Sequence, residues 1–192
     1  VAINRFVSYD TGEGDLIQYK SPSFSGLTLG AAVQFNGDGD DPILPDKGGK
    51  KSYPYQLAAM YEVDALELAV AMDSNDGAGP NENTYGLRAS YNLPDLRLTA
   101  EYHTRDNIAD IYGVQGIYTM GANQLVLSYE IEDQDSGNTI DVITLQALHN
   151  LSSNMYVYFE GVVASADDPT DFGSGTKSED QTQANVGAVY YF

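Results

Sequence analysis

The sequence predicts an all-β chain of antiparallel strands. Apolar residues recur at every second position in segments of about eight to eleven residues, and such segments follow one another along the whole chain. A period of two puts side chains on one face of a strand, whereas a helix requires a period of 3.6. The fifteen tyrosines and nineteen glycines fit a chain that is rich in strands and turns.

The first four strands are expected over residues 15–21, 27–36, 55–63 and 66–73. The second shows the pattern clearly, because small or polar residues oppose an apolar set made of Leu27, Leu29, Ala31, Val33 and Phe35. Only Asp64 and Ala65 separate the third segment from the fourth, which predicts a hairpin with a tight turn.

Seven further strands are expected over residues 85–93, 96–103, 112–119, 125–132, 143–147, 157–163 and 182–192, which makes eleven in all. Ile117 is an exception to the alternation of its segment. Short turns are expected at 94–95, 121–123 and 152–154. They alternate with longer polar connections at 37–52, 74–83, 105–110, 134–138 and 167–181.

The alternation of short and long connections predicts an up-and-down transmembrane β-barrel. The last segment supports this, because its apolar face continues to the C-terminal residue through Ala184, Val186, Ala188, Tyr190 and Phe192. In a barrel one face contacts lipid and the alternate residues contact water, so a mean hydropathy of −0.31 is compatible with a membrane protein. A soluble all-β binding module is the alternative, and it would bury the apolar face against a second sheet.

Composition excludes several functions. The net charge of −19 argues against nucleic acid as a partner, and the absence of cysteine excludes disulfides and thiolate metal sites. A catalytic dyad is conceivable, because His103 shares a face with Glu101, and Ser90 or Thr99 is expected nearby. However, no G-x-S-x-G motif, which would mark a nucleophilic serine, accompanies them. Neither an enzyme nor a cofactor is therefore expected.

Three segments resemble the general diffusion porins of Gram-negative outer membranes: DLIQYKSPSFSG at 15–26, HNLSSNMYVY at 149–158, and the terminal Tyr190-Tyr191-Phe192. This resemblance implies a sixteen-stranded barrel of which the chain holds the last eleven strands, in a single partial domain over 1–192. Residues 1–14 would be the tail of the constriction loop, with Asp10 and Glu13 near the pore. Residues 15–192 would form the strands with their short turns and long external loops. The first five strands would precede Val1.

The resemblance also implies function, location and partners. It implies a multi-pass protein of the cell outer membrane that forms a homotrimer and contacts lipid and lipopolysaccharide. Small hydrophilic solutes and ions would diffuse passively through its channel. The barrel-assembly machinery would recognise Tyr190 and Phe192 during biogenesis.

Residues that alternate with the lipid-facing set are expected to line the pore. Acids outnumber cations among them, which favours a mild preference for cations. Arg88 and Arg97 are expected on adjacent strands, either side by side or paired with Glu101 or another acid of the lumen. The expected pore-lining residues are Lys20, Glu62, Glu67, Arg88, Arg97, Glu101, Arg105, Glu130, Glu132 and Glu160, with Asp73 as a further acid.

Two hypotheses remain open at this point. Acidic loops, such as the one with Asp38, Asp40 and Asp41, either bind divalent cations that bridge to lipopolysaccharide or form a solvated surface. A substrate-specific channel is the other hypothesis, since Tyr158 and Tyr191 are inward aromatic candidates for a sugar path. A phosphate channel is less favoured, because it would need a cluster of lysines inside the pore, and Lys20 is the only lysine expected to point inward.

Overall fold

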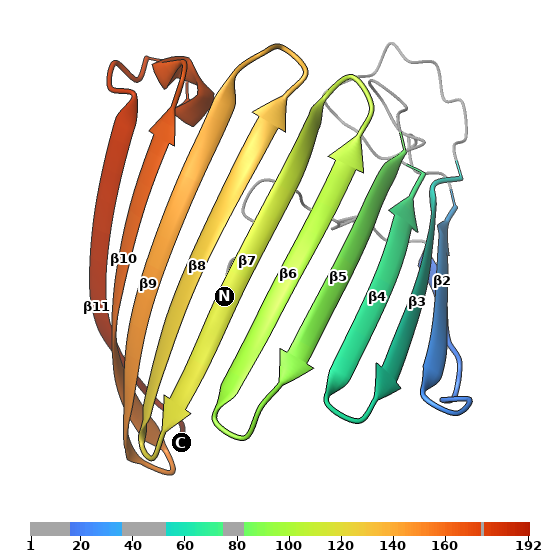
Figure 1. Cartoon of the computed structure of the whole chain (residues 1–192), viewed down its shortest axis with the longest axis horizontal. Helices are drawn as coiled ribbons and strands as arrows, with labels where there is room; N and C mark the ends of the chain where they lie inside the picture. The colour runs from blue at the N-terminus through green and yellow to red at the C-terminus, as the bar shows by residue number, and fades with distance from the viewer. Residues whose placement is uncertain (1–15, 36–52, 75–82, 174) are drawn as a thin grey trace. The chain divides into compact units, whose positions relative to one another are not determined.

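The computed structural model describes residues 16–35, 53–74, 83–173 and 175–192. These residues form eleven β-strands, and the strand order in the sheet equals their order in the sequence (Figure 1). Among the described residues no helix combines the length and the apolar character needed to cross a bilayer. The strands are β1 (Leu16–Lys20), β2 (Leu27–Gln34), β3 (Tyr55–Val63), β4 (Leu66–Asp73), β5 (Thr84–Asn92), β6 (Leu96–Arg105), β7 (Ala109–Met120), β8 (Asn123–Gln134), β9 (Thr139–Ser152), β10 (Met155–Ala166) and β11 (Asp180–Tyr190).

The prediction of eleven antiparallel strands is confirmed, but several strands are longer than expected. β9 has 14 residues, whereas the alternation marks only 143–147. Ile140, Val142 and Leu148 explain the difference, because they add apolar residues on the face that should be polar and so obscure the period. β11 ends at Tyr190 instead of Phe192.

The described residues fall into two compact units. The first unit contains 16–35, 53–74, 83–89 and 103–107, and the second contains 90–102, 108–173 and 175–192. In the first unit, Lys20 pairs with Gly30, Gly30 with Ala58, and Ala58 with Ala71, so these four residues share one face of β1 to β4.

Gly26 holds the start of β2 against β3 in the first unit. Its φ of +89° lies in the left-handed region, and a Cβ there would be 2.2 Å from the carbonyl oxygen of Glu62. Any side chain would collide with backbone, so only glycine allows the hydrogen bond that the Glu62 N–H donates to the Gly26 carbonyl at 3.0 Å.

In the second unit the register continues across β7 to β10, apart from one shift between Met155 and Tyr156 at the start of β10. Gly113 pairs with Glu130, Glu130 with Val142, Val142 with Ala164, and Ala164 with Gln181 on β11. Two-residue turns at 121–122 and 153–154 close the β7–β8 and β9–β10 hairpins. The β10–β11 connection is longer and contains a short 3-10 helix, η2 (Pro169–Phe172).

Asp168 caps η2 in that connection. Its carboxylate accepts hydrogen bonds from the hydroxyl of Thr170 at 2.6 Å and from the Thr170 backbone N–H at 2.8 Å. Both bonds favour the charged carboxylate, and they lower the pKa of Asp168 below its ordinary value.

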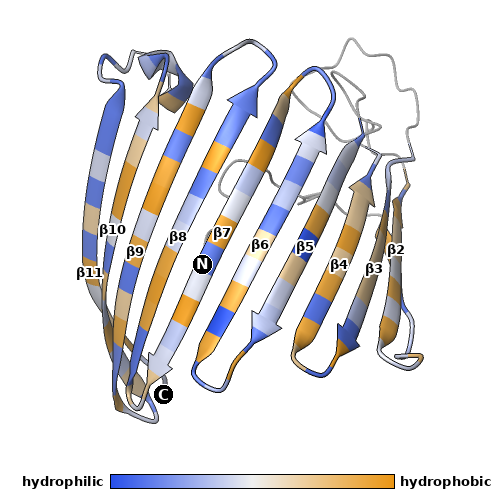
Figure 2. Ribbon diagram, in the orientation of Figure 1, coloured by the Kyte–Doolittle hydropathy of each residue, from blue (hydrophilic) through white to orange (hydrophobic). Residues whose placement is uncertain are grey.

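Each unit has an apolar face and a polar face, and Figure 2 shows the resulting alternation of hydropathy along the strands. In the second unit the apolar face carries Leu127 and Leu145, which are 57% and 46% exposed. The polar face carries Ser128 and Glu130, which are 6% and 4% exposed. Water-soluble sheets show the opposite distribution, because they bury the large apolar side chains. An exposed apolar face is what contact with lipid requires.

Tyrosines mark one end of the apolar face in the second unit. The hydroxyl of Tyr102 donates to Asp110 at 2.9 Å, and the hydroxyl of Tyr129 donates to Asp141. Both aspartates lie where their strands approach the longer connections. An aromatic ring that contacts hydrocarbon while its hydroxyl binds a polar group is typical of the membrane–water boundary.

Candidate functional site

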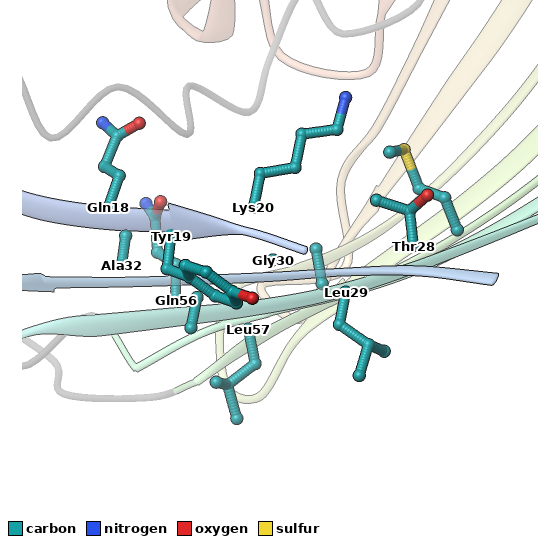
Figure 3. Close-up of a pocket in the computed structure, with 12 residues that line it drawn as sticks. Gln18, Tyr19, Lys20, Thr28, Leu29, Gly30, Ala32, Gln56 and Leu57 are labelled. Carbon is teal, nitrogen blue, oxygen red and sulfur yellow. The ribbon is translucent and has the colours of Figure 1, made fainter. Parts of the chain in front are cut away.

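The polar face of the first unit gathers amides, one lysine and acids. Figure 3 shows Gln18, Lys20 and Thr28 pointing to one side of the strands, while Leu29 and Leu57 point to the other. These residues border an open hollow of about 510 Å³. Further along the polar face, the amide of Gln56 donates to the carboxylate of Asp73 at 2.7 Å, so one amide and one acid lie side by side on β3 and β4.

Glu62 and Glu67 face each other across the β3–β4 hairpin, beside Asp64 in the turn. Directly opposed like charges repel and weaken a strand pair. Their presence concentrates negative charge at one end of the polar face. Arg88 and Arg105 also belong to this unit.

Arg97 is located in the second unit, beside Asn92. Its guanidinium donates to the amide oxygen of Asn92 at 2.9 Å, and the hydroxyls of Ser90 and Thr99 lie 3.0 Å apart on the same two strands. Asn92 is therefore a hydrogen-bond neighbour of Arg97, while Arg88 belongs to the other unit and its place beside Arg97 stays a prediction.

Three glutamates of the expected pore lining lie on the polar face of β8 and β10. Glu130 pairs with Gly113 and Val142 and is almost fully buried, whereas Glu132 and Glu160 are half-buried. The amide of Gln134 donates to the carboxylate of Glu132 at 3.1 Å. Glu101 belongs to the same unit.

Glu160 lies between two amides on neighbouring strands. Gln146 on β9 and Asn185 on β11 each donate to one oxygen of its carboxylate, both at 3.4 Å, and Gln183 donates to Asn185 at 3.4 Å. The register pairs Glu160 with both amide-bearing residues, so the network is imposed by the sheet.

Three tyrosines lie near the Glu160 network: Tyr156 and Tyr158 at the start of β10, and Tyr191 directly after β11. The ring centroids of Tyr156 and Tyr158 are 6.2 Å apart, and those of Tyr156 and Tyr191 are 6.3 Å apart. Tyr158 pairs with Gly187, where an added Cβ would lie 2.5 Å from the Tyr158 ring. The ring thus rests against the backbone of β11, and this contact requires glycine. Tyr158 and Tyr191 are among the expected inward residues, but Tyr156 is not, although it lies two residues before Tyr158 and therefore on the same face of the strand.

The polar face of the second unit also carries buried apolar side chains. Val126 is 1% exposed, and neighbouring strands contribute Ile111, Ile140, Val142 and Val162, all buried. For Val126 and Val162, the expectation that alternate positions contact water is wrong, because both side chains are buried. A period of two identifies the residues that share a face, but it does not show how far that face is covered.

Several expected site residues lie outside the described ranges, namely Asp10, Glu13, Asp38, Asp40 and Asp41. Within the described ranges, no group of three or more histidine, aspartate or glutamate side chains is placed to hold a metal ion. Tyr190 lies on the apolar face opposite Met155, and Phe192 follows the end of β11 and is fully exposed.

A sequence profile described as Gram-negative porin matches residues 2–171. The chain belongs to the Gram-negative porin family. It is a protein of the outer membrane, in agreement with the predicted location. Two relatives, the monosaccharide porin of a Halomonas species and the major outer membrane protein of Halomonas elongata, are each 24% identical to this porin chain. Each alignment covers 93% of this chain and 48% of the relative, so the chain spans about half the length of these proteins.

Solved porin structures share the fold. The anion-selective porin from Comamonas acidovorans superposes with a TM-score of 0.72 at 22% identity, over 92% of this chain and 59% of that one. OmpF of Salmonella typhi in complex with daunomycin gives 0.70 at 18% identity, over 92% and 61%. The trimer form of OmpT from Vibrio cholerae gives 0.61 at 17% identity, over 92% and 64%. The prediction of a porin barrel fold is confirmed.

Proposed function

We propose that this porin chain forms part of the wall of a water-filled channel through which small hydrophilic solutes and ions diffuse passively. The observation that carries the proposal is the reversed exposure of the two faces, with large apolar side chains outside and polar side chains sheltered. Membership of the porin family points to a channel instead of an enzyme. The apolar face would contact lipid and the polar face would line water.

Ion conductance tests this proposal. The full-length protein, purified from outer membranes in detergent, would be added to a planar lipid bilayer. Stepwise current increases are expected, together with swelling of liposomes in small sugars but not in large oligosaccharides. Insertion without any conductance or swelling would contradict the proposal.

We further propose a mild preference for cations. The charged residues on or near the polar faces are mostly acids, and a confined pore with excess carboxylates attracts cations. The solved porin from Comamonas acidovorans is named anion-selective, so the fold does not decide the sign. Reversal potentials in a potassium chloride gradient would decide it, and a clear anion preference would refute this part. The proposed lining consists of Lys20, Glu62, Glu67, Arg88, Arg97, Glu101, Arg105, Glu130, Glu132 and Glu160.

Partners are likewise proposed. A homotrimer is supported by the trimer form of the OmpT structure and by the small apolar face of β11, where Val186 is 81% exposed. Lipopolysaccharide is the expected outer-leaflet partner. Tyr190 and Phe192 would be read by the barrel-assembly machinery. Phe192→Ser is expected to lower the amount of folded, heat-modifiable protein in the outer membrane, and an unchanged amount would exclude that role.

A channel that favours monosaccharides is a second candidate. One relative is named a monosaccharide porin. The tyrosines beside Glu160 provide aromatic rings and hydrogen-bonding groups on one wall. Liposome swelling that is faster for hexoses than for uncharged solutes of the same size would favour this candidate.

A further inference from the structure

We propose that Tyr156, Tyr158 and Tyr191, together with Glu160, Gln146 and Asn185, form a weak binding site for one monosaccharide in its ring form. These six residues are called the tyrosine–glutamate site. The inference rests on the proposed channel, since the site lies on the face assigned to its lumen. It deepens the monosaccharide candidate by naming the residues that would recognise the sugar.

The aromatic half of the site is a row of three rings. Successive centroids are 6.2 Å and 6.3 Å apart, with interplanar angles of 49° and 44°. Tyr156 and Tyr158 are half-buried and Tyr191 is exposed, so parts of the rings remain accessible. Such surfaces accept the weakly polarised C–H groups on one side of a sugar ring, because the π face carries partial negative charge.

Tyr158 is held in place by β11. Its ring lies against Gly187, the residue with which it pairs, at a separation that leaves no room for a Cβ. A ring fixed by backbone loses little further freedom when a solute binds. Preorganisation of this kind favours affinity.

The polar half of the site lies two residues further along β10. Glu160 is therefore about 6.6 Å from Tyr158 along the strand, from the rise per residue. A carboxylate accepts hydrogen bonds from two adjacent hydroxyls, and each amide can both donate and accept. The side chains of Gln146, Glu160 and Asn185 can therefore bind the hydroxyls on the edge of a sugar ring while the face of that ring lies on the tyrosines.

The hydrogen bonds within this ladder leave capacity for a ligand. The Gln146–Glu160 and Asn185–Glu160 contacts are both 3.4 Å, at the long limit for a hydrogen bond. Long bonds are weak, so sugar hydroxyls can replace them at little cost. The negative charge of Glu160 disfavours anionic solutes, so an uncharged sugar fits this site better than an acidic one.

A ring-form sugar and a linear polyol distinguish binding from simple obstruction. Sorbitol offers hydroxyls similar to those of glucose but no rigid C–H face for the tyrosines. The experiment measures the ion conductance of the full-length porin in a planar bilayer during titration with glucose or sorbitol at equal osmolality. Glucose is expected to reduce conductance saturably, and sorbitol only in proportion to viscosity.

Two variants of Tyr158 locate the effect. Tyr158→Ser removes the ring and is expected to raise the half-saturating glucose concentration roughly 2- to 12-fold, from the worth of one aromatic contact. Tyr158→Phe keeps the ring and should bind glucose within about twofold of the parent. Tyr118→Leu is the matched control, because it removes an exposed tyrosine from the apolar face and should change nothing.

Glu160→Gln supplies a second test that preserves shape. The loss of a charged acceptor should weaken glucose binding several-fold, since hydrogen bonds to charged groups are the stronger ones. This variant keeps the proposal testable if Tyr158→Ser fails to fold, as judged by heat-modifiable migration.

The outcomes separate the two proposals. Normal ion conductance with equal effects of glucose and sorbitol would overturn the tyrosine–glutamate site and leave the diffusion channel intact. Saturable block by glucose that is unchanged in Tyr158→Ser and Glu160→Gln would also overturn it, because the sugar would then bind elsewhere. Absence of conductance in the parent protein would overturn both.

Discussion

A paired substitution on β9 tests whether the apolar face contacts lipid. Leu145 is the seventh of 14 residues in the strand and pairs with Leu127 and Gly161 on the apolar face. Gln146, the next residue, lies on the polar face and contacts Glu160. Leu145→Arg places a charge in the middle of the hydrocarbon, which costs about 2–4 kcal/mol at the bilayer midplane.

The matched control is Gln146→Arg. It adds the same side chain one residue away, where Glu160 can pair with the guanidinium, so a change within about 0.5 kcal/mol is expected. A cost of 2–4 kcal/mol corresponds to a decrease of about 30- to 700-fold in the folding equilibrium constant. The two variants should therefore be easy to distinguish.

The measurement is a urea titration of the full-length protein folding into phospholipid vesicles, followed by heat-modifiable migration. If the apolar face were exposed to water, Leu145→Arg would also change stability by no more than about 0.5 kcal/mol, since exposed positions tolerate charge. Equal stability of the two variants, or a greater loss for Gln146→Arg, would refute the assignment of the faces.

Three further outcomes are expected. Gly187→Ala should destabilise the protein by about 1–3 kcal/mol, because the added methyl group would collide with the Tyr158 ring. In the double variant with Tyr158→Ser, most of this cost should disappear. Additive losses of stability in denaturant titrations would contradict the contact between the two residues. Glu62→Lys should shift the reversal potential toward anion selectivity, because it reverses one charge of the opposed pair Glu62 and Glu67. An unchanged reversal potential would place Glu62 outside the conduction path. Asp168, whose pKa is lowered in the folded protein, should stabilise the loop above its unfolded pKa and lose this effect as pH falls through the folded value. Amide exchange at Thr170, corrected for its intrinsic rate, should then increase in acid, and Asp168→Asn should abolish the pH dependence.

Most of the fold could be predicted from the sequence, because the period of two is a local property. The positions of β3, β4 and β8 follow directly from their alternating residues. The failure at β9 has a physical cause as well: Ile140 and Val142 lie on the polar face, and an apolar residue there cannot be told from one that faces lipid. Element η2 was missed for a different reason, since a four-residue helix capped by one aspartate leaves almost no periodic signal.

The candidate site was predictable only in part. The alternation along each strand predicts that Glu130 and Glu160 lie on the polar face, since successive side chains of a strand point to opposite faces whatever its neighbours are. Neighbours across strands depend on register, which is set by turn geometry and by the packing of the whole sheet. Thus the proximity of Arg97 to Asn92, and of Tyr158 to Gly187, emerged from the structure alone.

The sequence by itself determined which residues share a face, the eleven strands found in the described residues, and which end of the chain carries the aromatic terminus. The tertiary structure decided which side chains meet across strands and which members of the polar face are covered. The division follows from the range of the interactions: alternation is fixed by the local pleat of one strand, whereas cross-strand contacts and burial require segments distant in sequence to align.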